Sequence, residues 1–198
     1  MIESSCVIVL GCFRSGTSAV AGTLRHLGVF MGDLFDPPNQ NNPKGFFEDL
    51  EFKKIHNWME DSSDIDHLYK NADDFYEELI AQREHDHPIW GIKDPLLCKY
   101  LGKLTTFLKA DHKLIVCRRP VEEIAASMTK SIGLGMNSDP MMFKPLAQHY
   151  IDHMEKSLAG YGGPVLEIQK TDSMLQILEP ISNFVGLPVT DAAREFLS

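Results

Sequence analysis

The stretch CVIVLGCFRSGTS, residues 6–18, decides the fold of this chain. An apolar and β-branched run of strand length breaks at Gly11, and from Thr17 the apolar residues recur at helical spacing. Between strand and helix, Gly11 and Gly16 permit a tightly turned loop. The amides of such a loop and the first turn of the helix point at one spot, where the helix dipole favours an anion. The stretch therefore predicts a phosphate-binding loop, with an ordinary strand-to-helix turn as the alternative.

This loop differs from the Walker A loop of nucleoside triphosphatases in the position of its cation. The spacing of Gly11 and Gly16 matches that motif, but Thr17 stands where the motif has its lysine. Ser18 keeps the usual hydroxyl position, and the cationic residue is Arg14, upstream of the second glycine. A loop without the lysine that reaches the β- and γ-phosphates is better suited to a single phosphate that carries a reactive group.

The loop residues FRSGTS (13–18) resemble the 5′-phosphosulfate loop of the sulfotransferase family, in a variant with Arg. Three later segments strengthen the resemblance: NPKGFFED (42–49), WGIKDP (90–95), and CRRPVE (117–122) running on to Ser127. Together they span most of the chain in the family's order. The resemblance implies 3′-phosphoadenosine 5′-phosphosulfate as the donor, with its 5′ end bound by Arg14, Ser15, Gly16, Thr17 and Ser18.

Strand-like and helical segments alternate along the rest of the chain. Apolar runs at 89–95, 113–117 and 164–168 predict further strands, and the connections are long enough for parallel crossovers. We therefore expect a three-layer α/β/α domain of the P-loop type, with a parallel sheet, over residues 1–198. Helical spacing predicts helices at 50–59, 73–81, 96–108 and 146–158, a helix that starts at Pro120, and a last helix through 175–185.

The length, composition and net charge of the chain argue against membrane and nucleic-acid partners. The chain has 198 residues, 43% of them hydrophobic, which is enough for one well-cored domain. No basic segment precedes an apolar signal core, and no apolar run approaches membrane-spanning length, so we expect a cytoplasmic protein without a membrane partner. A net charge of −9 argues against a nucleic-acid-binding surface. A nucleotide site must then be a local basic pocket.

The cysteines and the acidic stretch favour structural interpretations. Cys6, Cys12, Cys98 and Cys117 lack paired C-x-x-C spacing, so we expect reduced, structural thiols. Many acidic residues lie between 60 and 86, either as a solvated helical face or as an attractor for a cationic acceptor.

Glu48 is the candidate general base. A segment that follows the first helix can return to the crevice at the carboxyl ends of the strands. Transfer to a hydroxyl requires a base for the acceptor proton, and in several sulfotransferase branches a Glu from this region has that role. The alternative is that Glu48 caps or starts the helix near Leu50. The aromatic residues of that helix belong either to an acceptor pocket or to the core.

Two further strand ends carry candidate site residues. Lys93 and Asp94 end the strand at 89–95, where the pair either orients the sulfuryl group and acceptor or fixes the loop as an ion pair. The resemblance favours a functional role for Lys93 and leaves Asp94 undecided. The next strand ends in Arg118 and Arg119, whose guanidinium groups suit a second phosphate.

The family binds the donor's 3′-phosphate with an Arg at this strand end and a Ser on the following helix. Counting from Pro120 selects Arg118, whereas counting back from Ser127 selects Arg119. We take Arg118 with Ser127 first and Arg119 as the rival. The family's Arg-Lys-Gly segment, which many animal cytosolic members place near the end, is not found here.

The leading prediction is a metal-independent sulfotransferase that acts on a hydroxyl or amine of a small molecule or glycan. Arg14, Glu48 and Lys93 are its expected catalytic residues. The alternatives are an ATP-dependent small-molecule kinase, with Ser18 on magnesium and Asp94 as acid or base, and a non-catalytic nucleotide-binding protein of the same fold. The acceptor and the oligomeric state are not predicted.

Two later features carry weaker predictions. His149 and His153 have a metal-compatible spacing but lack a third ligand in the pattern, so we expect surface histidines. The glycine- and methionine-rich stretch 133–145 is either a lid over the acceptor or a simple connection, and 170–172 is expected to cap the last helix.

Overall fold

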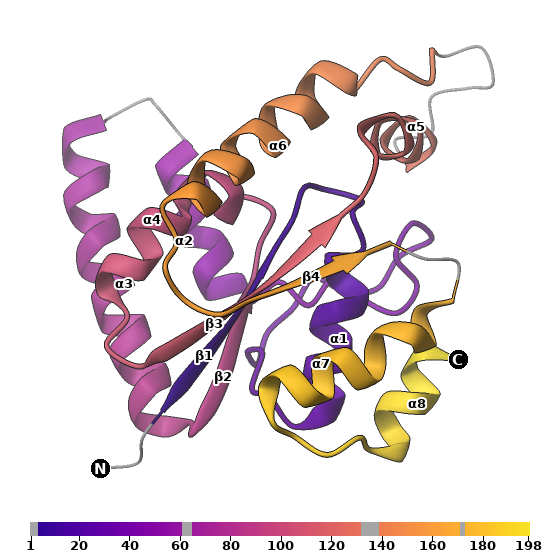
Figure 1. Ribbon diagram of the computed structural model, residues 1–198. Coiled ribbons are helices and arrows are strands. Elements are labelled where there is room, and N and C mark those ends of the chain that lie inside the picture. The colour runs from indigo at the N-terminus through magenta and orange to yellow at the C-terminus, as the bar shows by residue number, and fades with distance from the viewer. Residues whose placement is uncertain (1–3, 61–64, 132–138, 171–172) are drawn as a thin grey trace.

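The structure is a computed structural model that describes residues 4–60, 65–131, 139–170 and 173–198, without the side chains of 65–71. Its centre is a parallel sheet in the order β2-β1-β3-β4 (Figure 1). The strands are β1 (Ser5–Leu10), β2 (Ile89–Lys93), β3 (Asp111–Arg118) and β4 (Val165–Gln169). The first strand thus pairs with β2 on one side and β3 on the other, as expected for a phosphate loop at the centre of the sheet.

Helices cover both faces of this sheet, which confirms the predicted α/β class. In Figure 1, α2, α3, α4 and α6 lie on one side and α1, α7 and α8 on the other. The helices are α1 (Thr17–Leu27), α2 (Leu50–Glu60), α3 (Ile65–Asp86), α4 (Leu97–Phe107), α5 (Val121–Ser131), α6 (Lys144–Ala159), α7 (Leu178–Val185) and α8 (Asp191–Leu197), with a short 3-10 helix at Met174–Ile177.

The side-chain alternation of β1 divides the core into two clusters. Cys6, Ile8 and Leu10 pack with residues of α2 to α6, whereas Val7 and Val9 pack against α1, α7 and α8. Because neighbouring side chains of a strand point to opposite faces, one buried strand supplies both layers. This explains the continuous apolar run in the sequence.

Two helices differ from the sequence-based expectation. α3 extends over Ile65–Asp86, well beyond the predicted 73–81, because its many charged residues obscure the helical repeat. α8 was not predicted. Its first turn is capped by the Thr190 hydroxyl, which accepts a hydrogen bond of 3.1 Å from the Ala193 amide.

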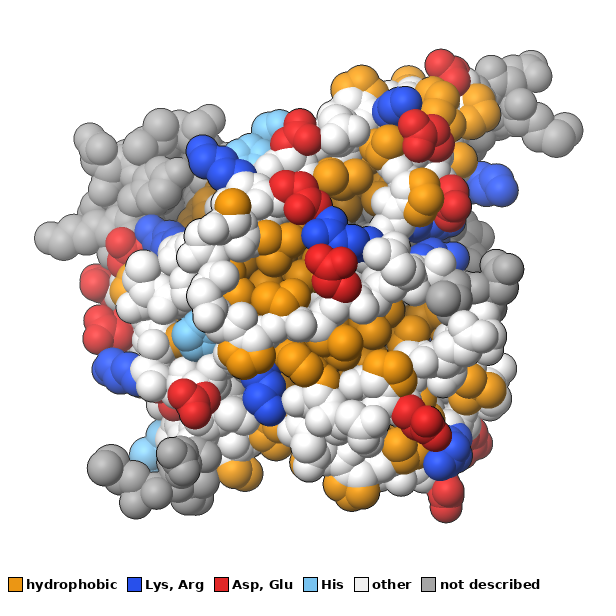
Figure 2. Space-filling model, in the orientation of Figure 1, with side chains coloured by type: hydrophobic (Ala, Val, Ile, Leu, Met, Phe, Trp, Pro, Cys, Tyr) orange, Lys and Arg blue, Asp and Glu red, His pale blue; other side chains and the backbone are white. Residues whose placement is uncertain are grey.

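The sheet edge at β4 faces the viewer in Figure 1. Val165 in this strand is exposed, and Figure 2 shows hydrophobic side chains across the middle of the same face. Among the described residues, no helix combines the length and the apolar character that crossing a membrane requires.

All four cysteines are buried free thiols, as predicted. Burial raises the pKa of Cys12 and of Cys117 to about 12, so neither side chain is a thiolate at neutral pH. Cys12 therefore shapes the loop as a small apolar residue and is not a reactive group.

A buried ion pair joins the start of α2 to the end of α3. Arg83 donates to Asp49 at 3.0 Å, and both side chains are almost fully buried. Asp49 also accepts a bond of 3.0 Å from the Glu51 amide, and it packs closely against Gly32, whose φ of 111° suits glycine. Asp49, and not Glu48, is thus the carboxylate that caps α2.

Replacing Asp49 with Asn is expected to lower the free energy of unfolding by about 3–5 kcal/mol, because the buried Arg83 cation loses its buried carboxylate and keeps only the exposed Glu51. The measurement is urea denaturation followed by circular dichroism. Glu51→Gln is the matched control: Glu51 also bonds Arg83 but is exposed, so its loss costs below about 1 kcal/mol. Equal losses in the two variants would contradict this account.

Candidate active site

A cavity of about 930 Å³ opens at the carboxyl edge of the sheet. Ligands of open α/β sheets bind at this edge, where the strand ends and the following loops converge. The lining comes from the loop after β1, the first turn of α1, the segment 36–46, the start of α2, and the ends of β3 and β4. Its polar and charged residues include Arg14, Thr17, Ser18, Asp36, Asn41, Asn42, Glu48, Lys53, Arg119, Ser127 and Lys170.

The phosphate loop has the predicted strand–loop–helix form. Gly16 is the N-cap of α1 with a φ of 97°, and no acidic residue occupies the first turn of the helix. Gly16, Thr17 and Ser18 line the cavity, so the positive end of the helix faces it. Ser15, unlike these three residues, does not line the cavity. Its buried hydroxyl donates to the Cys12 carbonyl at 2.6 Å and stabilises the conformation of the loop.

Arg14 lies in the cavity beside a second arginine. Its Nε donates to the Ser127 hydroxyl at 3.1 Å and its Nη1 to the Asn41 carbonyl at 3.2 Å. Arg119 donates to the Arg14 carbonyl at 2.7 Å. Burial, and after it the charge of Arg119, lowers the pKa of Arg14 from its ordinary value. Among the described residues, the Arg14 guanidinium has neutral partners only, so the cavity holds an uncompensated cation.

Lys93 and Glu48 form an ion pair next to Ser18. The Lys93 ammonium is buried and lies 2.5 Å from Glu48 Oε1, 3.3 Å from the Phe46 carbonyl and 3.4 Å from the Ser18 hydroxyl. The second oxygen of Glu48 lies 3.3 Å from Lys53 Nζ. Because each carboxylate oxygen has two lone pairs, Glu48 can still accept a bond from a ligand in the cavity.

Asp94 lies next to the site, but its carboxylate bonds His56 and the backbone at the start of α4. Its Oδ2 lies 2.7 Å from His56 Nδ1, and its Oδ1 accepts a bond of 2.9 Å from the Leu96 amide at the start of α4. The buried His56 also bonds the hydroxyl of Tyr76. Burial alone would raise the pKa of Asp94, but the bond to His56 holds it below its usual range. The Lys93–Asp94 ion pair considered from the sequence is not formed, since Lys93 bonds Glu48.

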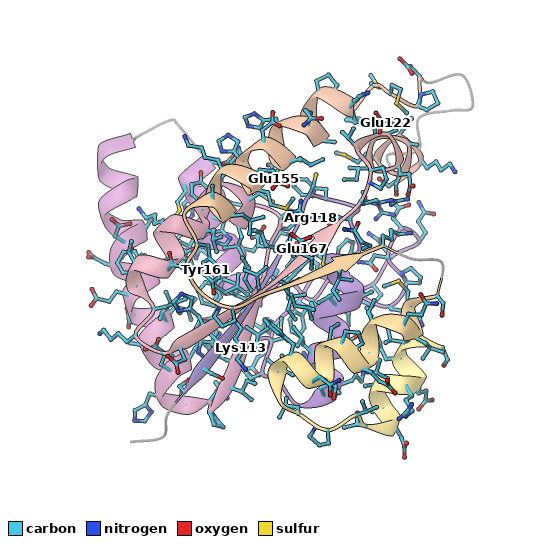
Figure 3. The ribbon with its side chains drawn as sticks, viewed as in Figure 1. Lys113, Arg118, Glu122, Glu155, Tyr161 and Glu167 are labelled. Atoms are coloured by element: carbon cyan, nitrogen blue, oxygen red, sulfur yellow. The ribbon has the colours of Figure 1, made fainter. Side chains whose placement is uncertain are left out.

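Arg118 is placed outside the cavity, which corrects our first choice at this strand end. Its guanidinium pairs with Glu155 on α6 and, at 2.8 Å, with Glu167 on β4, and these bonds raise its pKa. Figure 3 shows Arg118 between Glu155 and Glu167, on the face of the molecule that carries β4. Arg119, the rival, lines the cavity together with Ser127. The placement follows from the strand: successive side chains point to opposite sides.

Several cavity residues were missed by the sequence reasoning, and three of them are Lys170, Asn42 and Lys53. Lys170 follows β4 directly, so its position after the last predicted strand was an available signal. Asn42 donates to the Ser18 hydroxyl at 3.0 Å, and it lies in the segment that carries the family resemblance. Lys53 lies on the predicted helix at 50–59, but no local pattern showed which face of that helix meets the cavity.

The ends of three strands bring cations to the cavity. Arg14 follows β1, Arg119 follows β3 and Lys170 follows β4, whereas Lys93 at the end of β2 is buried and paired with Glu48 next to Ser18. In a protein with a net charge of −9, this is the local basic pocket that the sequence required of a nucleotide site. The arrangement can bind a ligand with more than one anionic group.

Two predicted features lie partly outside the described residues. Residues 133–138 of the expected lid at 133–145 lie outside them, and so do residues 171–172 of the expected cap at 170–172. Of the two histidines, His149 is exposed and His153 half-buried, with ring centroids 4.5 Å apart. Within the part of the chain that the structure describes, no cluster of three potential metal ligands is formed.

Comparison with solved structures shows what the fold is similar to. The chain matches the sulfotransferase domain of the olefin synthase from Synechococcus PCC 7002 with a TM-score of 0.61 and 16% identity, over 99% of this chain and 78% of that domain. It matches the sulfotransferase STF1 from Mycobacterium tuberculosis H37Rv with a TM-score of 0.58 and 16% identity, over 98% of this chain and 70% of that one.

A sugar kinase from Janibacter sp. HTCC2649 is also similar, with a TM-score of 0.54 and 14% identity over 96% of this chain and 98% of that one. No protein-family model matches the chain, and no curated protein sequence matches it. The chain therefore has a sulfotransferase-like fold, as the resemblance in its sequence implied.

Proposed function

We propose that this protein is a sulfotransferase that uses 3′-phosphoadenosine 5′-phosphosulfate. The observation that carries the proposal is the Arg14 guanidinium, half-buried with neutral partners, beside Arg119 and at the N-terminus of α1. Arg119 is paired with Glu123 at 3.0 Å, whereas Arg14 has no carboxylate partner among the described residues, so an anion that binds beside Arg14 offsets a charge that the protein leaves unpaired. The donor is an anion at both of its ends, and the sulfotransferase-like fold supports its choice.

The residues present fit the two ends of such a donor. Gly16, Thr17 and Ser18 offer first-turn amides and hydroxyls for the 5′ end. Arg119 and Ser127 would hold the 3′-phosphate, with Lys170 in the place of the missing Arg-Lys-Gly segment. Planar guanidinium groups bind phosphate oxygens in pairs, which favours Arg119 for this role.

The mechanism is an in-line displacement in which positioning and electrostatics lower the barrier. When bound, the donor supplies a sulfuryl group whose bond to the 5′-phosphate oxygen breaks as the acceptor oxygen attacks sulfur. Glu48 takes the proton of the acceptor hydroxyl. Arg14 stabilises the electron pair that remains on the phosphate oxygen, and Lys93 holds Glu48 and Ser18 in place. The products are a sulfate ester and adenosine 3′,5′-bisphosphate.

A small-molecule kinase is the second candidate, and the sugar kinase of similar fold is the observation that favours it. This function needs a carboxylate near the phosphate loop for magnesium or for acid–base chemistry. Asp94 was the residue considered for that role, and its two oxygens bond His56 and the Leu96 amide instead. Glu48 does line the cavity, but Lys93 and Lys53 pair with it. These placements support the sulfotransferase proposal over the kinase.

Calorimetric titration with adenosine 3′,5′-bisphosphate tests the proposal. The wild type is expected to bind the bisphosphate without a divalent metal ion, and Arg119→Ala to bind it about ten- to a hundredfold more weakly, since a charge-assisted phosphate contact is lost. Arg118→Ala, one residue away but outside the cavity, is the matched control with unchanged affinity. Magnesium-dependent binding of ATP in preference to the bisphosphate would favour the kinase, and binding of neither would indicate a non-catalytic protein.

A further inference from the structure

A second cavity of about 400 Å³ adjoins the first and shares two residues with it, Asp36 and Lys53. Its other lining residues are Leu50, Lys54, Asn57 and Trp58. Lys53 links the two spaces directly, because its ammonium lies 3.3 Å from Glu48 and also pairs with Asp36. Glu48, which we propose as the general base, lines the first cavity only, and Lys53 connects it to the second.

One face of α2 builds this cavity. Leu50, Lys53, Lys54, Asn57 and Trp58 recur at the three- and four-residue spacing that places side chains along one stripe of a helix. The opposite face carries the core residues, Phe52, Ile55, His56 and Met59. A helix whose second stripe combines an aromatic ring, an aliphatic side chain, an amide and two cations offers a surface for a small organic molecule.

Of the two lysines of this stripe, Lys53 forms ion pairs with carboxylates, whereas Lys54 lies over an aromatic ring. Lys53 is compensated by Asp36 and Glu48, whose bonds raise its pKa although burial alone would lower it. Lys54 rests over the ring of Trp58 at 4.8 Å from the ring centroid, and no carboxylate in the described ranges forms an ion pair with it. Among the described residues that line the second cavity, the one charge without an ion-pair partner is therefore the positive charge of Lys54.

We propose that the acceptor is itself an anion, namely a hydroxylated aromatic or similarly flat compound that carries a carboxylate. Its body lies against Trp58 and Leu50, its carboxylate meets Lys54, and its hydroxyl points to Glu48 in the first cavity. This inference rests on the proposed sulfotransferase activity and opposes the sequence-based alternative that the acidic stretch attracts a cationic acceptor. Lys54 and Trp58 then determine which acceptors the enzyme accepts.

The experiment compares three probes of one shape and different charge: para-hydroxyphenylpropanoate, its neutral amide, and the cation tyramine. Two readouts are taken in the presence of bound nucleotide: sulfate transfer from 3′-phosphoadenosine 5′-phosphosulfate, and quenching of tryptophan fluorescence with adenosine 3′,5′-bisphosphate. The chain has two tryptophans, of which Trp90 is fully buried, so quenching by a bound probe reports on Trp58.

In the wild type, para-hydroxyphenylpropanoate is expected to bind about tenfold more tightly than its amide, and tyramine more weakly than both. Lys54→Gln is expected to remove the difference between acid and amide, and Lys54→Glu to reverse the order in favour of tyramine. Lys156→Gln, which removes an exposed lysine of α6, is the control that keeps the wild-type order.

Equal binding of acid and amide to the wild type, no detectable binding of the acid, or an unchanged preference in Lys54→Gln would overturn the inference. The fluorescence titration measures the preference for the acid over the amide even when no sulfate is transferred. Failure of the proposed function has a different signature: the acid is preferred and the preference depends on Lys54, but adenosine 3′,5′-bisphosphate does not bind and no probe is sulfated.

Discussion

Glu48→Gln is expected to lower kcat for sulfate transfer by about 10²–10⁴-fold, since general bases contribute on this scale. The amide keeps the size of the side chain and can still accept a bond from Lys93, which lies 2.5 Å from Glu48 Oε1. It cannot accept the acceptor proton. The measurement is steady-state kinetics with saturating donor, together with calorimetric titration of adenosine 3′,5′-bisphosphate, whose affinity should stay close to that of the wild type.

The matched control is Glu51→Gln, the same substitution at an exposed carboxylate on the first turn of α2. Its kcat should equal that of the wild type, because Glu51 does not line the cavity. A Glu48→Gln enzyme with unchanged turnover would remove this carboxylate from the base role. Loss of turnover together with loss of bisphosphate binding would instead mean that Glu48 maintains the shape of the site through Lys93 and Lys53.

Arg14→Ala is expected to reduce kcat by about 10²–10³-fold, the effect of losing one preorganised charge that stabilises a developing oxyanion. The half-buried Arg14 guanidinium donates to the Ser127 hydroxyl and the Asn41 carbonyl. These neutral contacts orient the cation without neutralising it. Steady-state kinetics and bisphosphate titration are again compared, and the fall in kcat should exceed the fall in affinity.

Arg14→Lys separates charge from geometry. The lysine keeps the charge but cannot bond Ser127 and Asn41 at once through a planar group, so partial activity is expected. Arg14 also has a φ of 64°, and the same backbone conformation is required of both replacements, which makes strain an equal factor in the two variants. An Arg14→Ala enzyme whose kcat is normal and whose affinity alone falls would assign Arg14 to donor binding.

The central part of the fold could be predicted because the information is local. The apolar run before Gly11 and the glycines of the loop define a buried strand and a tight turn by themselves. The strand ends at Lys93 and at Arg118–Arg119 follow from similar runs, and parallel pairing brings them to one edge. This explains why most of the residues proposed from the sequence lie in the lining of the cavity.

The sequence could not show that Arg119, and not Arg118, lines the cavity, because that placement depends on distant partners. Glu155 on α6 and Glu167 on β4 bind Arg118, and nothing near the arginines in sequence indicates them. Likewise, the segment 36–46 that brings Asn42 to Ser18 is irregular, and its return to the loop is visible only in three dimensions. These features of the site depend on contacts between segments that are remote in sequence, so the sequence alone could not predict them.

Arg14, which has no carboxylate partner among the described residues, lies in one cavity with Arg119 and Lys170, and this has a thermodynamic consequence for the unliganded protein. Like charges gathered by folding repel one another more in the folded chain than in the unfolded chain, so they lower the melting temperature. A polyvalent anion that binds only the folded chain reverses this loss in proportion to its concentration and affinity. Heat resistance in this protein therefore depends on the anion it holds as well as on its core.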